Sequence, residues 1–491
     1  MSTALKLPKL PLGKMKMLIG GELCASASGR WLESINPANE ELLGEVPRGD
    51  KQDVERAYQA AAKAQPQWEA IGPGKRAEYL RKLADALEKR AEEALHIEVM
   101  DTGNTIAKMR FDVGSGLETL RFYAGVAHEM KGMTVPASVG NLHFTVREPY
   151  GVVGRIIPFN HPIMFAISKM AAPLMAGNSV IIKPSEQSPL SASILAEECA
   201  KIMPPGVVNI VTGLGAEAGD AIVRHPHIKR LAFTGSAKTG MAIQKAAAEV
   251  AVKIFSLELG GKNPMIVFPD VDIDKAVAGA IAGMNFAWQG QSCGSTSRLF
   301  LHESIHDKVL EKLVAKVKAL KLGEPLDETS QMGPINSKAQ YEKVSYYIKS
   351  GLEDGARLMT GGKRPEGKQF EKGFWMEPTV FADVKPDMRI AREEIFGPVL
   401  SVFKWSDLDQ CLEVANNVEY GLTGAVWTNN LQTALKTALR VKSGYVWING
   451  TSAHYKGMPF GGYRNSGVGR EEATDEMLSY TEEKSIHVML G

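Results

Sequence analysis

The stretch Val152–Val–Gly–Arg–Ile–Ile–Pro158 begins the part of the sequence that decides the fold. Its largely apolar run predicts a strand of the kind that a parallel sheet buries on both faces. Residues 164–175 predict a helix, and Ser179–Val–Ile–Ile–Lys183 predicts the next strand. Ser188 and Pro189 predict the N-cap and first turn of a further helix. The alternation continues to residue 259, with helices predicted over residues 188–202, 216–225 and 236–250 and strands over residues 207–211, 230–234 and 254–259.

Strands that alternate with helices of this length predict a doubly wound parallel sheet, which binds its ligand at the carboxyl ends of its strands. Two glycine-rich segments follow strands there, Gly213–Leu–Gly–Ala–Glu–Ala–Gly219 and Gly235–Ser–Ala–Lys–Thr–Gly240. Each is compatible with ordinary turn glycines. The second also opens a helix, where backbone N–H groups can meet a pyrophosphate. Their placement in one sheet favours a nucleotide site.

One cysteine, Cys293, stands in a tight turn between Gly290 and Gly294. Residues 272–289 predict a helix before it, and residues 299–301 predict a short strand after it. Catalysis would need the thiolate, yet only about 3% of an ordinary cysteine is ionised at pH 7, so a base or a positive dipole must help. The alternative is a small buried apolar side chain without a chemical role.

Three further clusters stand at predicted strand ends. Asn160 lies on a turn that two prolines stiffen. Lys183 and Glu186 supply a cation and an acid that could hold a ribose. Glu258 is a lone carboxylate in an apolar, glycine-rich run, where burial would raise its pKa towards that of a general base. Each cluster has an ordinary structural alternative, namely a turn amide, a surface ion pair and a helix-cap acid.

The composition is that of a globular protein with two or three domains, because the chain has 491 residues, of which 44% are hydrophobic and 23% charged. A net charge of +1 gives no electrostatic reason to expect nucleic acid or a membrane surface as a partner. The four cysteines are widely spaced, which argues against disulfides and a metal site and suits a cytoplasmic location. No run of about 18 apolar residues and no signal-peptide core is present, so we expect neither a membrane span nor secretion.

Together these clusters give the chain a resemblance to the NAD(P)-dependent aldehyde dehydrogenase superfamily over nearly its whole length. Seven motifs stand in the family's order: Pro158–Phe–Asn160, Lys183–Pro–Ser–Glu186, Phe233–Thr–Gly–Ser236, Leu257–Glu–Leu–Gly–Gly–Lys262, Gly290–Gln–Ser–Cys293, Glu393–Glu–Ile–Phe–Gly–Pro398 and Pro459–Phe–Gly–Gly–Tyr–Arg–Asn–Ser–Gly467. The departures are modest, with His161 in the first motif, Arg464 in the last, and Gly294–Ser–Thr–Ser297 after the cysteine. None of them removes a catalytic group.

The resemblance implies an α/β fold with a doubly wound, parallel-sheet cofactor domain, an α/β catalytic domain and a small oligomerisation sheet. It assigns residues 1–127 and 149–259 to the dinucleotide-binding domain and residues 260–474 to the catalytic domain. Residues 128–148 and 475–491 form the oligomerisation segment. Exposed strands in that segment would need partners, so we expect a homodimer or a homotetramer.

The resemblance also implies an oxidoreductase that converts an aldehyde to a carboxylic acid with a dinucleotide and water. The Cys293 thiolate would attack the carbonyl carbon, and the Asn160 amide with the Cys293 backbone N–H would hold the oxyanion. After hydride transfer leaves a thioester, Glu258 would activate the water that hydrolyses it. Lys169 and Glu471 match the family's proton relay. Their alternatives are a helix lysine that extends to solvent and an ordinary partner of Arg470.

For the cofactor, the resemblance assigns Lys183 and Glu186 to the adenosine ribose, Ser236 to the pyrophosphate, and Glu394 with Phe396 to the nicotinamide side. The Glu186 carboxylate suits two ribose hydroxyls and repels a 2′-phosphate, which favours NAD, while Lys183 leaves some room for NADP. The full set of predicted cofactor residues is Ile157, Phe159, Lys183, Ser185, Glu186, Gly215, Gly219, Gly235, Ser236, Leu259, Glu394 and Phe396.

The predicted substrate pocket is a mixed aromatic and polar wall made of His161, Phe165, Ser168, Trp288, Ser292, Gly294, His454 and Tyr455. It suits a medium-sized aromatic, terpenoid or polar-substituted aldehyde. Three alternatives stay open: a CoA-acylating aldehyde dehydrogenase, a cysteine-dependent thiol hydrolase or esterase, and a structural protein derived from the family. The first class generally lacks the base that Glu258 supplies, the second needs no dinucleotide, and the third expects the loss of a catalytic group.

Overall fold

The structure, a computed structural model, describes residues 10–490. One half is built on an eight-stranded sheet in the order β2-β1-β8-β7-β6-β9-β10-β20. Its five strands from β8 to β10 run parallel, which confirms the doubly wound sheet. The strands are β1 (Met17–Ile19), β2 (Glu22–Cys24), β6 (Val152–Ile156), β7 (Ser179–Lys183), β8 (Val208–Ile210), β9 (Arg230–Thr234), β10 (Ile254–Glu258) and β20 (Gly467–Val468).

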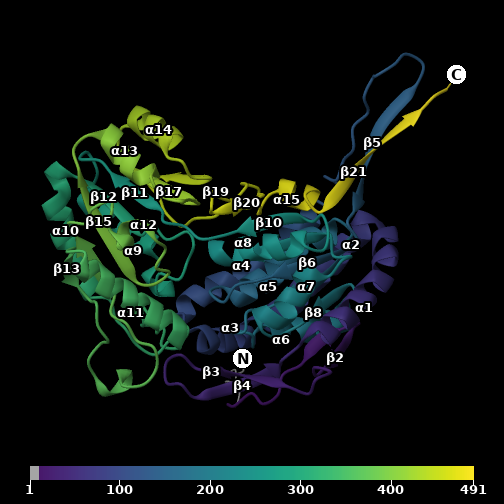
Figure 1. Ribbon diagram of the computed structural model, residues 1–491, viewed down its shortest axis with the longest axis horizontal. Helices are drawn as coiled ribbons and strands as arrows, with labels where there is room; N and C mark the ends of the chain where they lie inside the picture. Colours follow the sequence, from purple (N-terminus) through teal and green to yellow (C-terminus); the bar gives the residue numbers. More distant parts are fainter. Residues whose placement is uncertain (1–9, 491) are drawn as a thin grey trace, which may run out of the picture.

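Helices cover both faces of this sheet (Figure 1). Successive residues of a strand point to opposite faces. Val153 and Ile182 pack among the helices α2 to α6, whereas Val152 and Ile181 pack among α1, α7 and α8. Both faces are therefore apolar, as the sequence of the strands predicted. The helices are α1 (Lys51–Ala70), α2 (Gly72–Lys89), α3 (Ala91–Thr102), α4 (Ile106–Gly125), α5 (Pro162–Met175), α6 (Ala192–Ile202), α7 (Asp220–Arg224) and α8 (Ala237–Ala248).

The other half is built on a seven-stranded sheet in the order β13-β14-β15-β12-β11-β17-β18, parallel except for β13. Ile266 faces a core formed with α11 to α13, and its neighbour Met265 faces a core formed with α9 and α10. The elements are β11 (Pro264–Val267), α9 (Ile273–Met284), η2 (Phe286–Trp288), β12 (Arg298–His302), α10 (Glu303–Lys318), α11 (Lys338–Glu353), β13 (Arg357–Thr360), η3 (Lys368–Phe370), β14 (Thr379–Ala382), α12 (Arg389–Arg392), β15 (Val399–Trp405), α13 (Leu408–Asn416), β17 (Thr423–Trp427), α14 (Leu431–Arg440) and β18 (Tyr445–Ile448).

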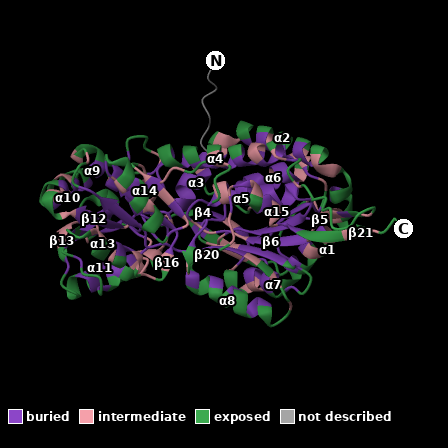
Figure 2. Ribbon diagram, turned by 90° about the horizontal axis from the view of Figure 1, so that it is seen from above, coloured by how far each residue is buried: buried purple, intermediate pink, exposed green. Residues whose placement is uncertain are grey.

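A two-stranded arm projects from the first half (Figure 1). Strands β5 (Leu142–Pro149) and β21 (Thr481–Val488) pair antiparallel from Leu142↔Val488 to Thr481↔Pro149. The arm is largely exposed or half-buried, as Figure 2 shows. The predicted tail strand is present, but the short helix α15 (Thr474–Leu478) comes before it.

The two halves are joined by backbone hydrogen bonds as well as by the chain. Strand β20 comes after the second sheet in the sequence, yet it pairs with β10 of the first sheet through Leu257↔Val468. The Leu259 N–H donates to the Ser466 carbonyl at 2.9 Å. The remaining strands form two small pairs, β3 (Trp31–Ile35) with β4 (Leu42–Pro47) and β16 (Tyr420–Gly421) with β19 (Tyr463–Arg464).

Three predicted helices differ from the structure by more than two residues or in type. The helix predicted to begin at Ser188 begins at Ala192, because the Ser188 hydroxyl donates to the Phe159 carbonyl at 2.9 Å instead of capping a helix. The helix predicted to reach residue 289 ends at Met284, since Asn285 adopts a left-handed conformation with φ 56°. The helix predicted over residues 216–225 is a π-helical turn, η1 (Gly215–Gly219), followed by α7.

Within residues 10–490, no helix is both long and apolar enough to cross a bilayer. Over the same residues, no three His, Cys, Asp or Glu side chains are grouped as metal ligands would be. Cys24, Cys199, Cys293 and Cys411 are all free thiols.

Candidate active site

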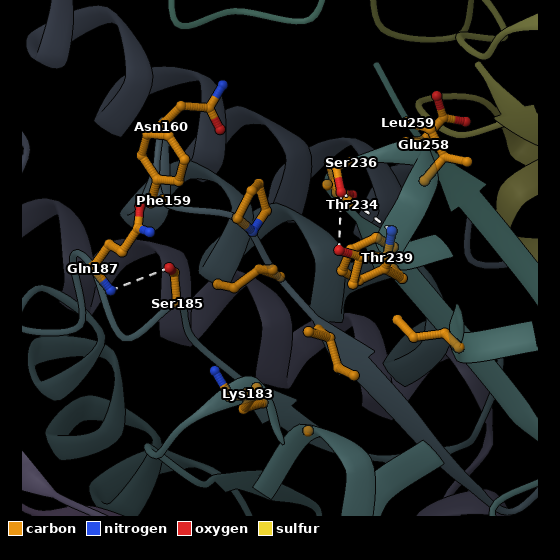
Figure 3. Close-up of a pocket in the computed structure, with 18 of the residues that line it drawn as sticks. Phe159, Asn160, Lys183, Ser185, Gln187, Thr234, Ser236, Thr239, Glu258 and Leu259 are labelled. Atoms are coloured by element: carbon orange, nitrogen blue, oxygen red, sulfur yellow. Dashed lines mark hydrogen bonds between the residues drawn. The ribbon is translucent and has the colours of Figure 1, made fainter. Parts of the chain in front are cut away.

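A cavity of about 530 Å³ opens at the carboxyl ends of β6, β7, β9 and β10. Every residue that the sequence assigned to the cofactor lines this cavity, from Ile157 to Phe396. Figure 3 shows Asn160 and Glu258 towards one end and Lys183 towards the other. We call this space the cofactor cavity.

One wall of the cofactor cavity is the start of α8. Ser236 is the N-cap of this helix, and its hydroxyl accepts the Thr239 N–H at 3.2 Å. Gly235 precedes Ser236. Gly215 and Gly219, in the turn that follows β8, also line the cavity. A helix start beside glycines offers backbone N–H groups to a diphosphate, so these residues fit the pyrophosphate of a dinucleotide.

Lys183 and Glu186 form an ion pair in the same cavity, with Nζ 2.9 Å from Oε2. The Lys183 ammonium also donates to the Pro184 carbonyl at 2.7 Å. Burial opposes ionisation of Glu186, but the charge and hydrogen bond of Lys183, together with backbone N–H donors, hold the pKa of the carboxyl below its ordinary value. The carboxylate is therefore available to accept hydrogen bonds from ribose hydroxyls.

Glu394 and Phe396 close the cavity from the second half of the protein. Glu394 Oε1 accepts the Gly261 N–H at 2.8 Å. The Phe396 ring meets the Phe159 ring edge-on, with centroids 5.7 Å apart. The two halves therefore meet at this end of the cofactor cavity.

A second cavity of about 190 Å³ reaches Cys293 from the other side. Cys293 and Glu258 line both cavities, so a ligand in either one can reach them. We call this space the substrate cavity. Its aromatic lining comprises Phe111, Phe165, Trp288, Trp447 and Phe460.

The turn that carries Cys293 is fixed by close backbone packing. Gly290 has φ 67°, and a Cβ atom there would lie 2.2 Å from the Gly397 carbonyl oxygen. The Asn263 side chain donates to the Cys293 carbonyl at 2.7 Å and to the Ser295 carbonyl at 2.9 Å. The sequence analysis missed this role of Asn263, because an asparagine two residues beyond a glycine pair gives no signal of its distant partner.

The surroundings of Cys293 favour its neutral thiol. Burial raises its pKa to about 12, and the Glu394 and Glu258 carboxylates add to the increase. Lys169 opposes them only in part. A base that removes the thiol proton is therefore needed before Cys293 can act as a nucleophile.

Asn160 is buried next to the cysteine turn. One N–H of its side-chain amide donates to the Gln291 carbonyl at 2.9 Å. The backbone carbonyl of Asn160 accepts the Asn104 side-chain N–H at 3.0 Å, which fixes the turn from the other side. An amide has two N–H donors, so one stays available for a ligand that lies beside Cys293.

Glu258 ends strand β10 with its side chain buried. Neither of its carboxylate oxygens has a hydrogen-bond partner within the described part of the chain. Burial, followed by the charge of Glu471, raises its pKa well above the ordinary value. A Cβ atom at Gly461 would lie 2.9 Å from Glu258 Oε1, so a glycine there leaves space beside the carboxyl group.

Lys169 and Glu471 form a buried ion pair, which Arg155 joins through Glu471 at 3.1 Å. Burial disfavours the charged forms, but the mutual attraction together with Glu476 and Glu472 raises the pKa of Lys169, and Lys169 together with Arg155 lowers that of Glu471. Arg470 instead donates to the carbonyls of Gly462 and Gly469. Lys169 therefore does not extend to solvent, and Glu471 is not paired with Arg470.

Two histidines in the substrate cavity are each oriented by a carboxylate. His161 Nδ1 lies 2.6 Å from Asp112, and His454 Nδ1 lies 3.0 Å from Glu472. Phe165, Ser168, Trp288, Ser292 and Gly294 also line the cavity, as the sequence analysis placed them. Tyr455 does not line it, since its side chain points to solvent with 62% exposure.

Several residues of the substrate cavity escaped the sequence analysis. Asp112 and Ser115 lie on one face of α4, a helix without a recognisable motif. Lys456 lies in the loop before β19 and Glu472 in the loop after β20, on either side of the motif at residues 459–467. A helical period in residues 106–125 indicates which side chains share a face, but it does not indicate what that face meets.

The fold and this pair of cavities around a cysteine define the class of the protein. The sequence profile described as "Aldehyde dehydrogenase family" matches residues 24–486, and the chain belongs to this family of oxidoreductases. Among its relatives is the aldehyde dehydrogenase tropH of Talaromyces stipitatus, 45% identical over 94% of this chain and 90% of that protein. The hydroxyisobutyraldehyde dehydrogenase of Mycolicibacterium austroafricanum is 40% identical, over 96% and 94%.

Solved structures agree with this assignment. An NAD+ complex of an aldehyde dehydrogenase from Bacillus cereus superposes with a TM-score of 0.94, at 40% identity over 97% of each chain. A putative aldehyde dehydrogenase from Burkholderia cenocepacia superposes with a TM-score of 0.95, at 38% identity over 96% of this chain and 97% of that one. The predicted fold class is confirmed.

Proposed function

We propose that this protein oxidises a medium-sized aldehyde to the carboxylic acid, with NAD and water as co-substrates, through a covalent intermediate on Cys293. The observation that carries the proposal is the meeting of two cavities at Cys293 and Glu258. One cavity has the dinucleotide features described above, and the other has an aromatic and polar wall. The NAD+ complex of the Bacillus cereus relative supports the same cofactor.

NAD, when bound, supplies the hydride acceptor. The residues of the chain make the aldehyde able to release that hydride. In the first turnover the Cys293 thiol gives its proton to water, and the thiolate then attacks the carbonyl carbon, which makes the carbon tetrahedral and its oxygen negative. The free N–H of the Asn160 amide and the Cys293 backbone N–H are the donors that hold this oxyanion. When the oxyanion collapses, the hydride leaves the carbon and a thioester remains on Cys293.

Glu258 is the general base of the second half-reaction. Its raised pKa suits it to accept the proton of a water molecule that attacks the thioester. The carbon–sulfur bond breaks, the acid is released, and Cys293 leaves as the thiolate that begins the next turnover. Lys169 and Glu471 form the path by which the proton leaves Glu258, since Glu471 raises the pKa of Glu258 and contacts Lys169.

Glu186 selects NAD over NADP in this proposal. Its carboxylate would meet the like charge of a 2′-phosphate at the ribose. The Lys183 ammonium, 2.9 Å from Glu186, offsets part of the repulsion. We therefore expect NAD to be preferred, with residual activity on NADP.

The arm of β5 and β21 is the proposed contact between subunits, with residues 128–148 and 475–490 contributing to it. Strand β5 pairs with β21 on one side and bonds to residues 133–135 on the other, so within the described residues β21 has the outer edge without a paired strand. Exposed strand edges favour further pairing. Residues 10–127 and 149–259 then form the cofactor domain and residues 260–474 the catalytic domain, with β20 as the strand that the second domain contributes to the first sheet.

The test is NADH formation over a panel of aromatic, terpenoid and polar-substituted aldehydes, with identification of the product. Formation of NADH together with the free acid supports the proposal. A product that forms only as a thioester when CoA is supplied would assign a CoA-acylating enzyme instead. Hydrolysis of thioesters or esters without any binding of NAD would assign a hydrolase.

A further inference from the structure

Lys456 brings a cation into the substrate cavity without a carboxylate partner. Its Nζ donates to the Ser115 hydroxyl at 3.3 Å, which is its one hydrogen bond within residues 10–490. No Asp or Glu oxygen of those residues lies within 4.0 Å of it. Burial lowers the pKa of Lys456, and Glu472, Glu118 and Glu476 oppose the decrease without any of them contacting the ammonium. The ammonium is thus partly desolvated and opposite a neutral hydroxyl.

Two carboxyl groups of the cavity have no partner within the described residues: the exposed Glu118 and the buried Glu258, whose raised pKa favours its neutral form. The other four are engaged. Asp112 contacts His161, Glu471 contacts Lys169, Glu472 contacts His454, and Glu476 accepts the Tyr123 hydroxyl. None of them needs a cation from the substrate. Within the described residues, Lys456 is the lysine of the cavity that lacks a counter-ion, since Lys169 is paired with Glu471.

Ser115 places this cation on the helix that forms the far wall. Residues Phe111, Asp112, Ser115, Glu118 and Thr119 of α4 line the cavity at helical spacing. Ser115 is three residues beyond Asp112, which is about 4.5 Å along a helix axis. Asp112 contacts His161, the neighbour of Asn160, so Ser115 and Lys456 are displaced along the wall from the residues around the reacting carbon.

We propose that the substrate is an aldehyde that carries a carboxylate, and that Lys456, supported by Ser115, binds this carboxylate. The proposal rests on the aldehyde oxidation proposed above and narrows its substrate class. A partly buried ammonium without a counter-ion is costly, and an anionic substrate group removes that cost, whereas a neutral group does so only in part. The surrounding Trp288, Phe165 and Phe111 suit a flat, unsaturated or aromatic skeleton between the two ends.

The experiment compares para-formylbenzoate with its methyl ester, and succinic semialdehyde with its methyl ester. Within each pair the aldehyde is kept and the charge is removed. In the wild-type protein we expect kcat/KM to favour each acid over its ester by roughly ten- to a hundredfold, the range for one hydrogen bond to a charged group. Most of the difference should appear in KM, because the carboxylate binds away from the reacting carbon.

Three variants test the residue. Lys456→Met should reduce the acid-to-ester ratio of kcat/KM at least tenfold, and Lys456→Arg should restore most of it. Lys349→Met, which removes a lysine whose side chain is 75% exposed on α11, is the matched control and should leave the ratio as it is. Melting temperatures of all variants show whether each one is folded.

Two results would overturn the proposal while the oxidation of aldehydes stands. One is a wild-type ratio near one or in favour of the esters, which needs no variant. The other is a folded Lys456→Met variant that keeps the wild-type ratio. If the wild-type protein forms no NADH from any of the four compounds or from the wider aldehyde panel, the proposed function itself is wrong.

Discussion

Glu258→Gln is the substitution that best separates the two half-reactions. It keeps the size of a buried side chain whose oxygens have no partner within the described residues, and it removes the ability to accept a proton. Loss of a general base slows its own step by about 10²- to 10⁴-fold. We expect steady-state NADH formation to fall within that range, while the first hydride transfer still occurs.

Rapid mixing of the variant with NAD and aldehyde measures this directly. The expected trace is a burst of about one NADH per active subunit, followed by slow turnover. Mass spectrometry of quenched protein should find the acyl group on Cys293. Loss of the burst would contradict the assignment, since it would mean that Glu258 chiefly deprotonates the cysteine. Turnover at the wild-type rate would exclude Glu258 from either role.

The raised pKa of Glu258 adds a pH dependence to the same experiment. Wild-type turnover should rise with pH as this carboxyl group ionises, and the rise should be absent in Glu258→Gln. For stability, a carboxyl whose folded pKa is raised stabilises the native state below its unfolded pKa of about 4.3, and this contribution is lost as pH rises through the folded pKa. The melting temperature of the variant should therefore rise relative to that of wild type as pH increases. Glu311→Gln, at an exposed site on α10, should show neither effect.

Cys293→Ala should abolish NADH formation with NAD binding retained in a titration, and appreciable turnover would exclude Cys293 as the nucleophile. Asn160→Ala should lower kcat by about 10²- to 10³-fold, the cost of one oxyanion donor, with little change in KM for NAD; a loss below threefold would argue against that role. Glu186→Ser should narrow a preference for NAD of roughly tenfold or more, mostly through better use of NADP, and an unchanged ratio would assign the selectivity elsewhere. Light scattering should find a dimer or tetramer that truncation after residue 480 disrupts, whereas a monomeric full-length protein would refute the role of the arm.

The first sheet was predictable because its strands carry their information locally. Residues 179–183 and 230–234 became β7 and β9 with the predicted bounds, since each is a short apolar run between turn residues. The end of a helix was less predictable where a tertiary contact decides it. Ser188 resembles an N-cap in the sequence. Its hydroxyl instead donates to the Phe159 carbonyl, and the helix begins at Ala192.

The candidate site divides in the same way. Cys293, Glu258 and the cofactor residues stand in motifs, because the chemistry requires those residue types at fixed spacings. The substrate wall does not. Ser115 and Lys456 are 341 positions apart in the chain, and only the packing of α4 against the loop before β19 brings them together. Tyr455 shows the opposite case. It stands between two residues of the wall in the sequence, yet its side chain is exposed to solvent.

The separation of the two cavities has a consequence for how such proteins diversify. Residues 111–119 and 452–460 contribute to the substrate cavity and not to the cofactor cavity. Mutations in these segments can therefore change which aldehyde is accepted without touching the dinucleotide or the cysteine turn. Selection can therefore act on substrate range and on cofactor use as independent traits. A duplicated gene can acquire a new substrate while it keeps an intact reaction centre.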